Sequence, residues 1–103
     1  MGEFVPVGKL DDIGEGEMGP FEAGSVRVAV ANIDGTLYAF DDTCTHRGCS
    51  LSEGDVEETS VVCPCHGGEF DLESGDVIGG PPLDPIHVYE VRVRDGVIEV
   101  SVD

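Results

Sequence analysis

The chain has 103 residues, of which 40% are hydrophobic, and this is enough for one domain with a modest core. It carries 22 acidic and 5 basic residues, a formal charge of −17, and such a surface repels the phosphates of nucleic acids and anionic membranes. The sequence has no apolar run of about 18 residues or more and no basic start followed by an apolar stretch. We therefore expect a soluble, intracellular protein.

Two interpretations of this charge stay open. Surface carboxylates can steer a protein toward a basic partner. They also keep a protein soluble, for example in a salt-rich cytoplasm, and acidic blocks are usually solvated faces. The sequence favours the second interpretation, because its acidic residues are spread through predicted loops and strand edges.

Along the chain, alternating hydrophobicity and β-branched residues predict strands, and helical periodicity is nearly absent. Asp34-Gly35 and Asp95-Gly96 lie between such runs and predict hairpin turns, because Gly tolerates the positive φ that these turns need. Residues 11–24 are rich in Gly and acid and predict a connecting loop without recognisable chemistry. The predicted strands cover residues 4–10, 25–33, 36–41, 87–94 and 97–102. The sequence thus predicts an all-β, antiparallel fold of two hairpins and an N-terminal strand.

A glycine-rich insertion, about residues 42–85, separates the two hairpins and holds all four Cys and two of the three His. Within it, short strands are expected at residues 60–63, 69–72 and 76–78. We therefore expect a single domain over residues 1–103. Its base would be formed by residues 1–41 and 86–103, and the insertion would form a subdomain.

The four Cys fall inside one 22-residue window, which in an intracellular chain indicates metal or redox chemistry more than a disulfide scaffold. Two segments each hold one Cys and one His. They are Cys44-Thr45-His46 and, sixteen residues further on, Cys63-Pro64-Cys65-His66. The short spacings place each pair on a tight loop, and two facing loops would offer two thiolates and two imidazoles to one metal centre.

Two kinds of metal centre use such ligands. Structural zinc sites usually take theirs from C-x2-4-C and H-x3-5-H pairs. A [2Fe–2S] cluster can instead have two thiolates on one iron and two imidazoles on the other. One Cys and one His on each of two loops fits this asymmetric cluster better than it fits zinc.

The two segments resemble the cluster-binding loops of Rieske iron–sulfur proteins. They read Cys44-Thr45-His46-Arg47-Gly48-Cys49 and Cys63-Pro64-Cys65-His66-Gly67-Gly68, with Cys-x-His and Cys-x-x-His at about the family's spacing. The resemblance implies a Rieske-like antiparallel β-sandwich or barrel base with an inserted cluster-binding subdomain of two loops. It extends to Gly80-Pro81-Pro82, which looks like the proline-containing loop that shields the cluster in the family.

The resemblance also implies a role for each ligand. Cys44 and Cys63 would supply thiolates to the buried iron of one [2Fe–2S] cluster per chain, and His46 and His66 would supply imidazoles to the outer iron. Residues that would surround this cluster are Arg47, Gly48, Gly67, Gly68 and Pro81. The glycines would let backbone N–H groups approach the bridging sulfides, and Arg47 would contact a partner or pair with a nearby carboxylate.

Two further expectations follow from the resemblance. Cys49 and Cys65 stand where some members carry a disulfide that ties the loops together; the alternative is two free thiols. High-potential members place a Ser and a Tyr hydroxyl on the cluster, and the matching positions here are Gly68 and Phe70. The loss of both hydrogen bonds destabilises the reduced state and predicts a potential in the lower part of the family range of about −150 to +300 mV.

Rieske oxygenases add a mononuclear iron held by two His and a carboxylate. Beyond the cluster ligands only His87 remains, which we expect at the surface, so we expect no catalytic centre in this chain. The resemblance implies a monomeric, cytoplasmic one-electron carrier. It would link a ferredoxin reductase to a terminal oxidoreductase such as a ring-hydroxylating dioxygenase, and these partners would have a basic docking surface. Alternatives are the small subunit of an assimilatory, nitrite-type reductase and a zinc-bound structural module.

Overall fold

The structure is a computed structural model that describes residues 3–43, 49–65, 68–79 and 84–101. These residues form strands and two short 3₁₀ helices, which confirms the predicted all-β class. The strands are β1 (Phe4–Lys9), β2 (Met18–Ala23), β3 (Val26–Ile33), β4 (Thr36–Asp41), β5 (Asp55–Glu57), β6 (Ser60–Val62), β7 (Glu69–Asp71), β8 (Val77–Gly79), β9 (Val88–Arg94) and β10 (Val97–Ser101). The 3₁₀ helices are η1 (Leu10–Asp12) and η2 (Leu51–Glu53).

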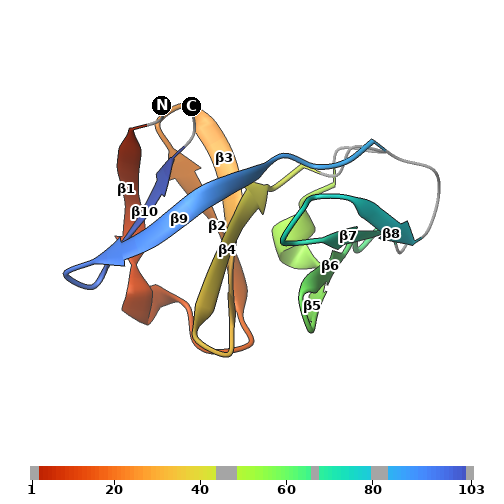
Figure 1. Cartoon of the computed structure of the whole chain (residues 1–103), viewed down its shortest axis with the longest axis horizontal. Coiled ribbons are helices and arrows are strands. Elements are labelled where there is room, and N and C mark those ends of the chain that lie inside the picture. The colour runs from red at the N-terminus through yellow and green to blue at the C-terminus, as the bar shows by residue number, and fades with distance from the viewer. Residues whose placement is uncertain (1–2, 44–48, 66–67, 80–83, 102–103) are drawn as a thin grey trace.

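The strands make two antiparallel sheets that lie side by side (Figure 1). The larger sheet has the strand order β1-β10-β9-β4-β3-β2, and the smaller has the order β5-β6-β7-β8. The chain leaves the larger sheet after β4, builds the smaller sheet and returns in β9. Phe21 on β2 lies so close to Gly8 on β1 that a Cβ on this glycine would be 2.5 Å from the ring. The two edges of the larger sheet therefore meet, and the sheet curls toward a barrel.

Both predicted hairpin turns are present. The turn between β3 and β4 has φ of 54° at Asp34 and 86° at Gly35, and the turn between β9 and β10 has 54° at Asp95 and 79° at Gly96. Two successive positive φ values are typical of the type I′ turn, whose twist matches that of the flanking strands. The Asp-Gly pairs therefore fix the register of both hairpins.

The prediction of a loop over residues 11–24 is wrong in part. Residues Met18–Ala23 form β2, which pairs with β3 from Met18 opposite Ala31 to Ala23 opposite Val26. Gly19 and Pro20 led to the prediction of a loop, because both residue types are depleted in strands. An edge strand tolerates a proline, since only one side of it takes part in the hydrogen-bond ladder. The strand β5 and the helix η2 were also not predicted.

The strand pair β3 and β4 is buried on both faces. Val28 and Val30 pack in the core inside the larger sheet, whereas Ala29 and Ala31 pack in a second core between the two sheets, together with Phe40 of β4. This two-sided burial explains the continuous apolar run at residues 28–31. The smaller sheet and the segments next to it also contribute side chains to this second core, namely Leu51, Val61, Cys63, Phe70 and Leu72. This core therefore holds the segment with the candidate ligands against the larger sheet.

In the part of the chain that the structure describes, we find no helix with the length and apolar character needed to cross a membrane.

Candidate metal centre

Cys63 is the predicted ligand that the structure describes, and it is placed directly after β6. Its side chain is 1% exposed and packs with Leu51 and Phe70 in the core between the sheets. Its backbone N–H donates to the carbonyl oxygen of Gly68 at 2.7 Å, which closes the loop over residues 63–68 at its base. The second candidate ligand loop is thus short and anchored in an apolar environment.

The other predicted ligands and several predicted neighbours lie outside the described residues. These are Cys44, His46, Arg47, Gly48, His66, Gly67 and Pro81. Their roles stay predictions.

A disulfide joins the two candidate loops. Cys49, at the end of the first loop, is bonded to Cys65 in the second, with their Cα atoms 6.5 Å apart and sixteen positions apart in the sequence. This confirms the predicted pairing, and Cys65 is exposed whereas Cys49 is half-buried. The bond brings together segments that are expected to supply one thiolate and one imidazole each.

The base of the first loop is closed by backbone contacts. Thr43 forms an antiparallel bridge with Ser50, and the N–H of Leu51 donates to the carbonyl oxygen of Asp42 at 2.6 Å. The chain therefore enters and leaves residues 44–49 at one place. The predicted tight loop itself, with Cys44 and His46, lies outside the described residues.

Asp42 is a fully buried carboxylate at this base, and it is not among the predicted site residues. Arg27 on β3 donates from Nε to Asp42 Oδ2 at 2.5 Å, and the N–H of Ser52 donates to Oδ1 at 2.8 Å. Hydrogen bonding to Asp42, and then its charge, raise the pKa of the Arg27 guanidinium above its usual value. The adjacent Cys-x-His motif is the one signal that could have drawn attention to Asp42.

Residues 3–90 match the family model of the Rieske [2Fe-2S] domain, which covers most of the chain.

The chain belongs to the Rieske [2Fe–2S] family.

Relatives of this Rieske protein include ferredoxin components of dioxygenases. It is 38% identical over 102 residues to the anthranilate 1,2-dioxygenase ferredoxin subunit of Burkholderia cepacia, covering 99% of this chain and 94% of the relative. The ferredoxin of carbazole 1,9a-dioxygenase from Nocardioides aromaticivorans IC177 is 27% identical, with a TM-score of 0.91 over 97% of this chain and 98% of that one. These relatives match this protein over nearly their whole length.

A second similar structure contains two proteins. It is a complex of reduced oxygenase and oxidised ferredoxin in carbazole 1,9a-dioxygenase, and the matching chain is 33% identical with a TM-score of 0.86. The match covers 95% of this Rieske protein and 92% of that chain.

The described residues of this Rieske protein fit the cluster that the family implies, one [2Fe–2S] per chain. The thiol of Cys63 is buried among apolar side chains, where a thiolate needs a metal to balance its charge. The disulfide and the two closed loop bases hold both ligand segments together. Mixed thiolate and imidazole donors are the ligands of the Rieske type of cluster.

The ends of the inserted segment of this Rieske protein are joined by a second set of contacts. The N–H of Asp41 donates to the carbonyl oxygen of His87 at 3.0 Å, and the Tyr89 hydroxyl donates to Asp41 Oδ1 at 2.5 Å. The pKa of Tyr89 is raised above its usual range. Burial is the largest cause, and the hydrogen bond to Asp41 and the charge of Asp41 add to it. His87 is exposed directly before β9, as predicted, with its ring 4.4 Å from that of Tyr89.

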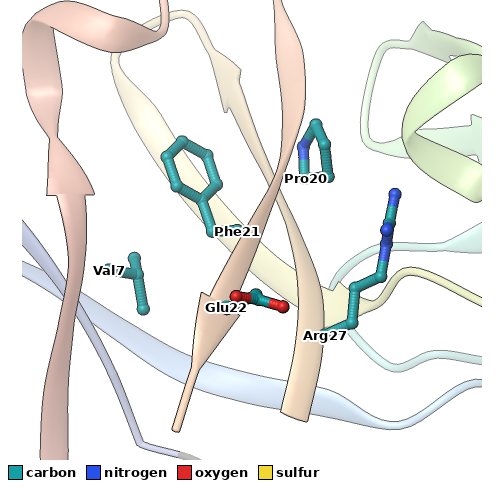
Figure 2. A pocket seen from close by; sticks show the side chains of 5 residues that line it. All are labelled: Val7, Pro20, Phe21, Glu22 and Arg27. Carbon is teal, nitrogen blue, oxygen red and sulfur yellow. The ribbon is translucent and has the colours of Figure 1, made fainter. Parts of the chain in front are cut away.

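A surface pocket of about 490 Å³ lies near the meeting edges of the larger sheet. Figure 2 shows the five residues that line it, Val7, Pro20, Phe21, Glu22 and Arg27. None of its described lining residues is a Cys or His, and Arg27 already pairs with Asp42. The pocket therefore adds nothing to the ligand set of this Rieske protein.

Proposed function

We propose that this chain is a one-electron carrier that takes electrons from a ferredoxin reductase and passes them to a terminal oxygenase such as a ring-hydroxylating dioxygenase. The observation that supports this most is the match to dioxygenase ferredoxin subunits over nearly the whole of both chains. Residues 1–103 would form one Rieske domain that acts as a cytoplasmic monomer.

Cys44 and Cys63 are proposed as the thiolate ligands, and His46 and His66 as the imidazole ligands. When bound, the cluster would supply a site that stores one electron at a time, at a potential higher than that of an all-thiolate ferredoxin. The protein would exclude water from the thiolate side, because Cys63 is packed in the core. The disulfide between the loops would keep the four ligands together during changes of charge.

The proposed carrier has a low potential for its family. Gly68 and Phe70 offer no hydroxyl where high-potential members place a Ser and a Tyr hydroxyl. Phe70 is completely buried on β7, and the carbonyl oxygen of Gly68 accepts from Cys63. Fewer hydrogen bonds to the sulfur atoms leave the more negative, reduced state less stabilised.

The partners are proposed to dock through basic surfaces. The described residues between positions 49 and 79 contain eight acidic side chains and no Lys or Arg. This segment includes the smaller sheet and the described parts of both ligand loops. Its charge would attract the basic face of a reductase or an oxygenase.

The function is tested by mixing the chemically reduced protein with an oxidised Rieske dioxygenase loaded with its aromatic substrate. We expect oxidation of the carrier, and formation of hydroxylated product when a reductase, its reductant and dioxygen are also supplied. Cys63→Ser, which removes one proposed ligand, serves as the inactive control. A wild-type protein that stays reduced in the presence of dioxygenases from the anthranilate and carbazole systems would contradict the proposal.

A further inference from the structure

The helix η2 lies beside β2 and β3 of the larger sheet, and η2 and the glycine after it contact the described ends of both ligand loops. On the side of the first loop, the N–H groups of Leu51 and Ser52 donate to the backbone and side-chain oxygens of Asp42, at 2.6 and 2.8 Å. Asp42 is in turn bonded to Arg27 of β3. The segment is thus tied to the larger sheet at the point where the first ligand loop begins.

On the side of the second loop, Gly54 touches the chain on either side of Cys63. A Cβ on Gly54 would overlap the carbonyl oxygen of Val62 and would lie 3.1 Å from Cδ of Pro64. The φ of Gly54 is −89°, which any residue can adopt, so the close approach of the backbone excludes a side chain here. The segment therefore contacts both chain neighbours of Cys63 directly.

Leu51 takes part on both sides, because its N–H donates to Asp42 and its side chain packs in the core that holds Cys63. Its side chain is 0% exposed and belongs to the same core as Cys63, Phe40 and Phe70. A packed interior transmits a displacement of one group to its neighbours, because it has few voids. Movement at Asp42 would reach Cys63 through this side chain.

From these contacts we propose that residues 51–54 set the distance between the two ligand loops. Asp42, Arg27 and Gly54 are then positioning residues for the cluster, although none of them is a ligand. This inference rests on the ligand assignment proposed above. Loss of either link would displace one loop relative to the other and weaken retention of the cluster while every ligand remains.

A second ion pair of the chain provides a matched control for Arg27. Arg92 on β9 donates from Nε to Glu99 on β10 at 2.6 Å, and its side chain is 45% exposed against 55% for Arg27. The acid partners differ, because Asp42 is 1% exposed whereas Glu99 is 16% exposed and lies on the larger sheet away from the loops. Loss of the partner of a buried charge is far more disruptive than loss of an exposed pair.

The first experiment compares Arg27→Gln with Arg92→Gln, which change the net charge equally. We expect cluster release to an iron chelator, followed by visible absorbance, to be about tenfold faster in Arg27→Gln and to be unchanged in Arg92→Gln. Arg27→Lys, which keeps the charge, should restore part of the retention. In the protein as purified, hydrogen exchange measured by mass spectrometry should speed up in peptides that span Leu51 and Ser52 in Arg27→Gln alone.

The second experiment compares Gly54→Ala with Gly19→Ala, each of which adds one methyl group. Gly19 lies on β2, where a Cβ would sit 3.7 Å from the Phe21 ring in ordinary contact. We expect faster cluster release and an altered electron paramagnetic resonance spectrum of the reduced protein in Gly54→Ala only. This spectrum reports the ligand geometry, which a general loss of stability would not change.

The inference is overturned if Arg27→Gln and Gly54→Ala release the cluster at the rates of their controls. The failure of the proposed function would look different. A carrier that stays reduced beside the dioxygenases would still hold its cluster, and its variants would still release the cluster faster than their controls, whereas a wrong ligand assignment would leave the wild type without iron or sulfide. In that case the hydrogen exchange of Leu51 and Ser52 would still decide whether Arg27 holds this segment in place.

Discussion

Phe70 links the sequence to the redox potential at the scale of a single residue. Its side chain is fully buried on β7, in the same core as the candidate ligand Cys63. By the family resemblance, its position matches that of the Tyr whose hydroxyl bonds to the cluster in high-potential Rieske proteins. The missing hydroxyl can therefore be put back by a substitution that adds one oxygen atom.

Phe70→Tyr should raise the midpoint potential. A hydrogen bond worth about 1 kcal/mol more in the reduced state corresponds to about 40 mV for a one-electron couple. Protein-film voltammetry measures this shift. Phe40→Tyr, which adds a hydroxyl elsewhere in the same core, is the control and should leave the potential unchanged. If Phe70→Tyr only lowers stability, by about 1–3 kcal/mol for an unpaired buried hydroxyl, its hydroxyl does not reach the cluster.

The sequence could predict the role of a residue when a local motif determines it, and could not when contacts with distant parts of the chain determine it. Cys49 and Cys65 could be paired from the family resemblance, because they stand at the positions where some members carry a disulfide. Asp42 could not be singled out, since its burial depends on Arg27 fifteen positions away. Gly54 has a negative φ and no local signal, and only the approach of Val62 shows why it is a glycine.

At the scale of elements, local chemistry predicted the two hairpins because each turn needs two residues with positive φ and the chain offers Asp-Gly at both places. The strand β2 escaped prediction because its pairing with β3, and not its composition, makes it a strand. The same holds for β5, which has three residues and is stabilised by β6. Short elements that depend on tertiary pairing carry little signal in their own sequence.

The contact between β4 and β9 is short and has a titratable group beside it. These strands pair only at Ala39 with Tyr89 and at Phe40 with Val88 among the described residues, and the Tyr89 hydroxyl reinforces the contact by donating to Asp41. The raised pKa of Tyr89 means that the folded state favours the neutral phenol. Tyr89 therefore contributes its full stabilisation below its pKa in the unfolded state, about 10. This stabilisation is lost as the pH rises through the higher pKa of Tyr89 in the folded state.

Tyr89→Phe should lower the free energy of unfolding by about 1 kcal/mol at neutral pH, through loss of one hydrogen bond. Above about pH 10 the wild type should lose stability faster than the variant, so that the difference between them shrinks. Denaturant titrations from pH 7 to about 11 would measure this. Tyr38→Phe, which removes the hydroxyl of a half-buried tyrosine on β4, is the control for the change of side chain. A difference between wild type and Tyr89→Phe that stays constant over this pH range would show that Tyr89 does not stabilise the contact.

At the scale of the whole molecule, charge is distributed unevenly between the two sheets. The basic residues that the structure describes, Lys9, Arg27, Arg92 and Arg94, all lie on strands of the larger sheet. The smaller sheet, at the other end of the molecule in Figure 1, has only acidic charges in its strands. Solubility alone requires a high net charge but no such separation, so the separation favours electrostatic steering of a basic partner.

Electron transfer to a basic partner should therefore slow with added salt. Between about 0.01 and 1 M ionic strength the Debye length falls from about 30 to about 3 Å, and we expect the second-order rate constant for reduction of the oxygenase to fall by about tenfold or more. Stopped-flow mixing measures the rate. An uncharged small-molecule oxidant is the control and should show no salt dependence. If the oxygenase behaves like that oxidant, the acidic charge serves solubility alone.

The metal and sulfide content of the protein as purified tests the central claim most directly, because every functional inference above depends on a cluster held by two Cys and two His. The account predicts the content of one [2Fe–2S] cluster per chain, with its iron and acid-labile sulfide lost together in Cys63→Ser and no zinc in their place. A wild-type chain that contains one zinc and no iron or sulfide would contradict it.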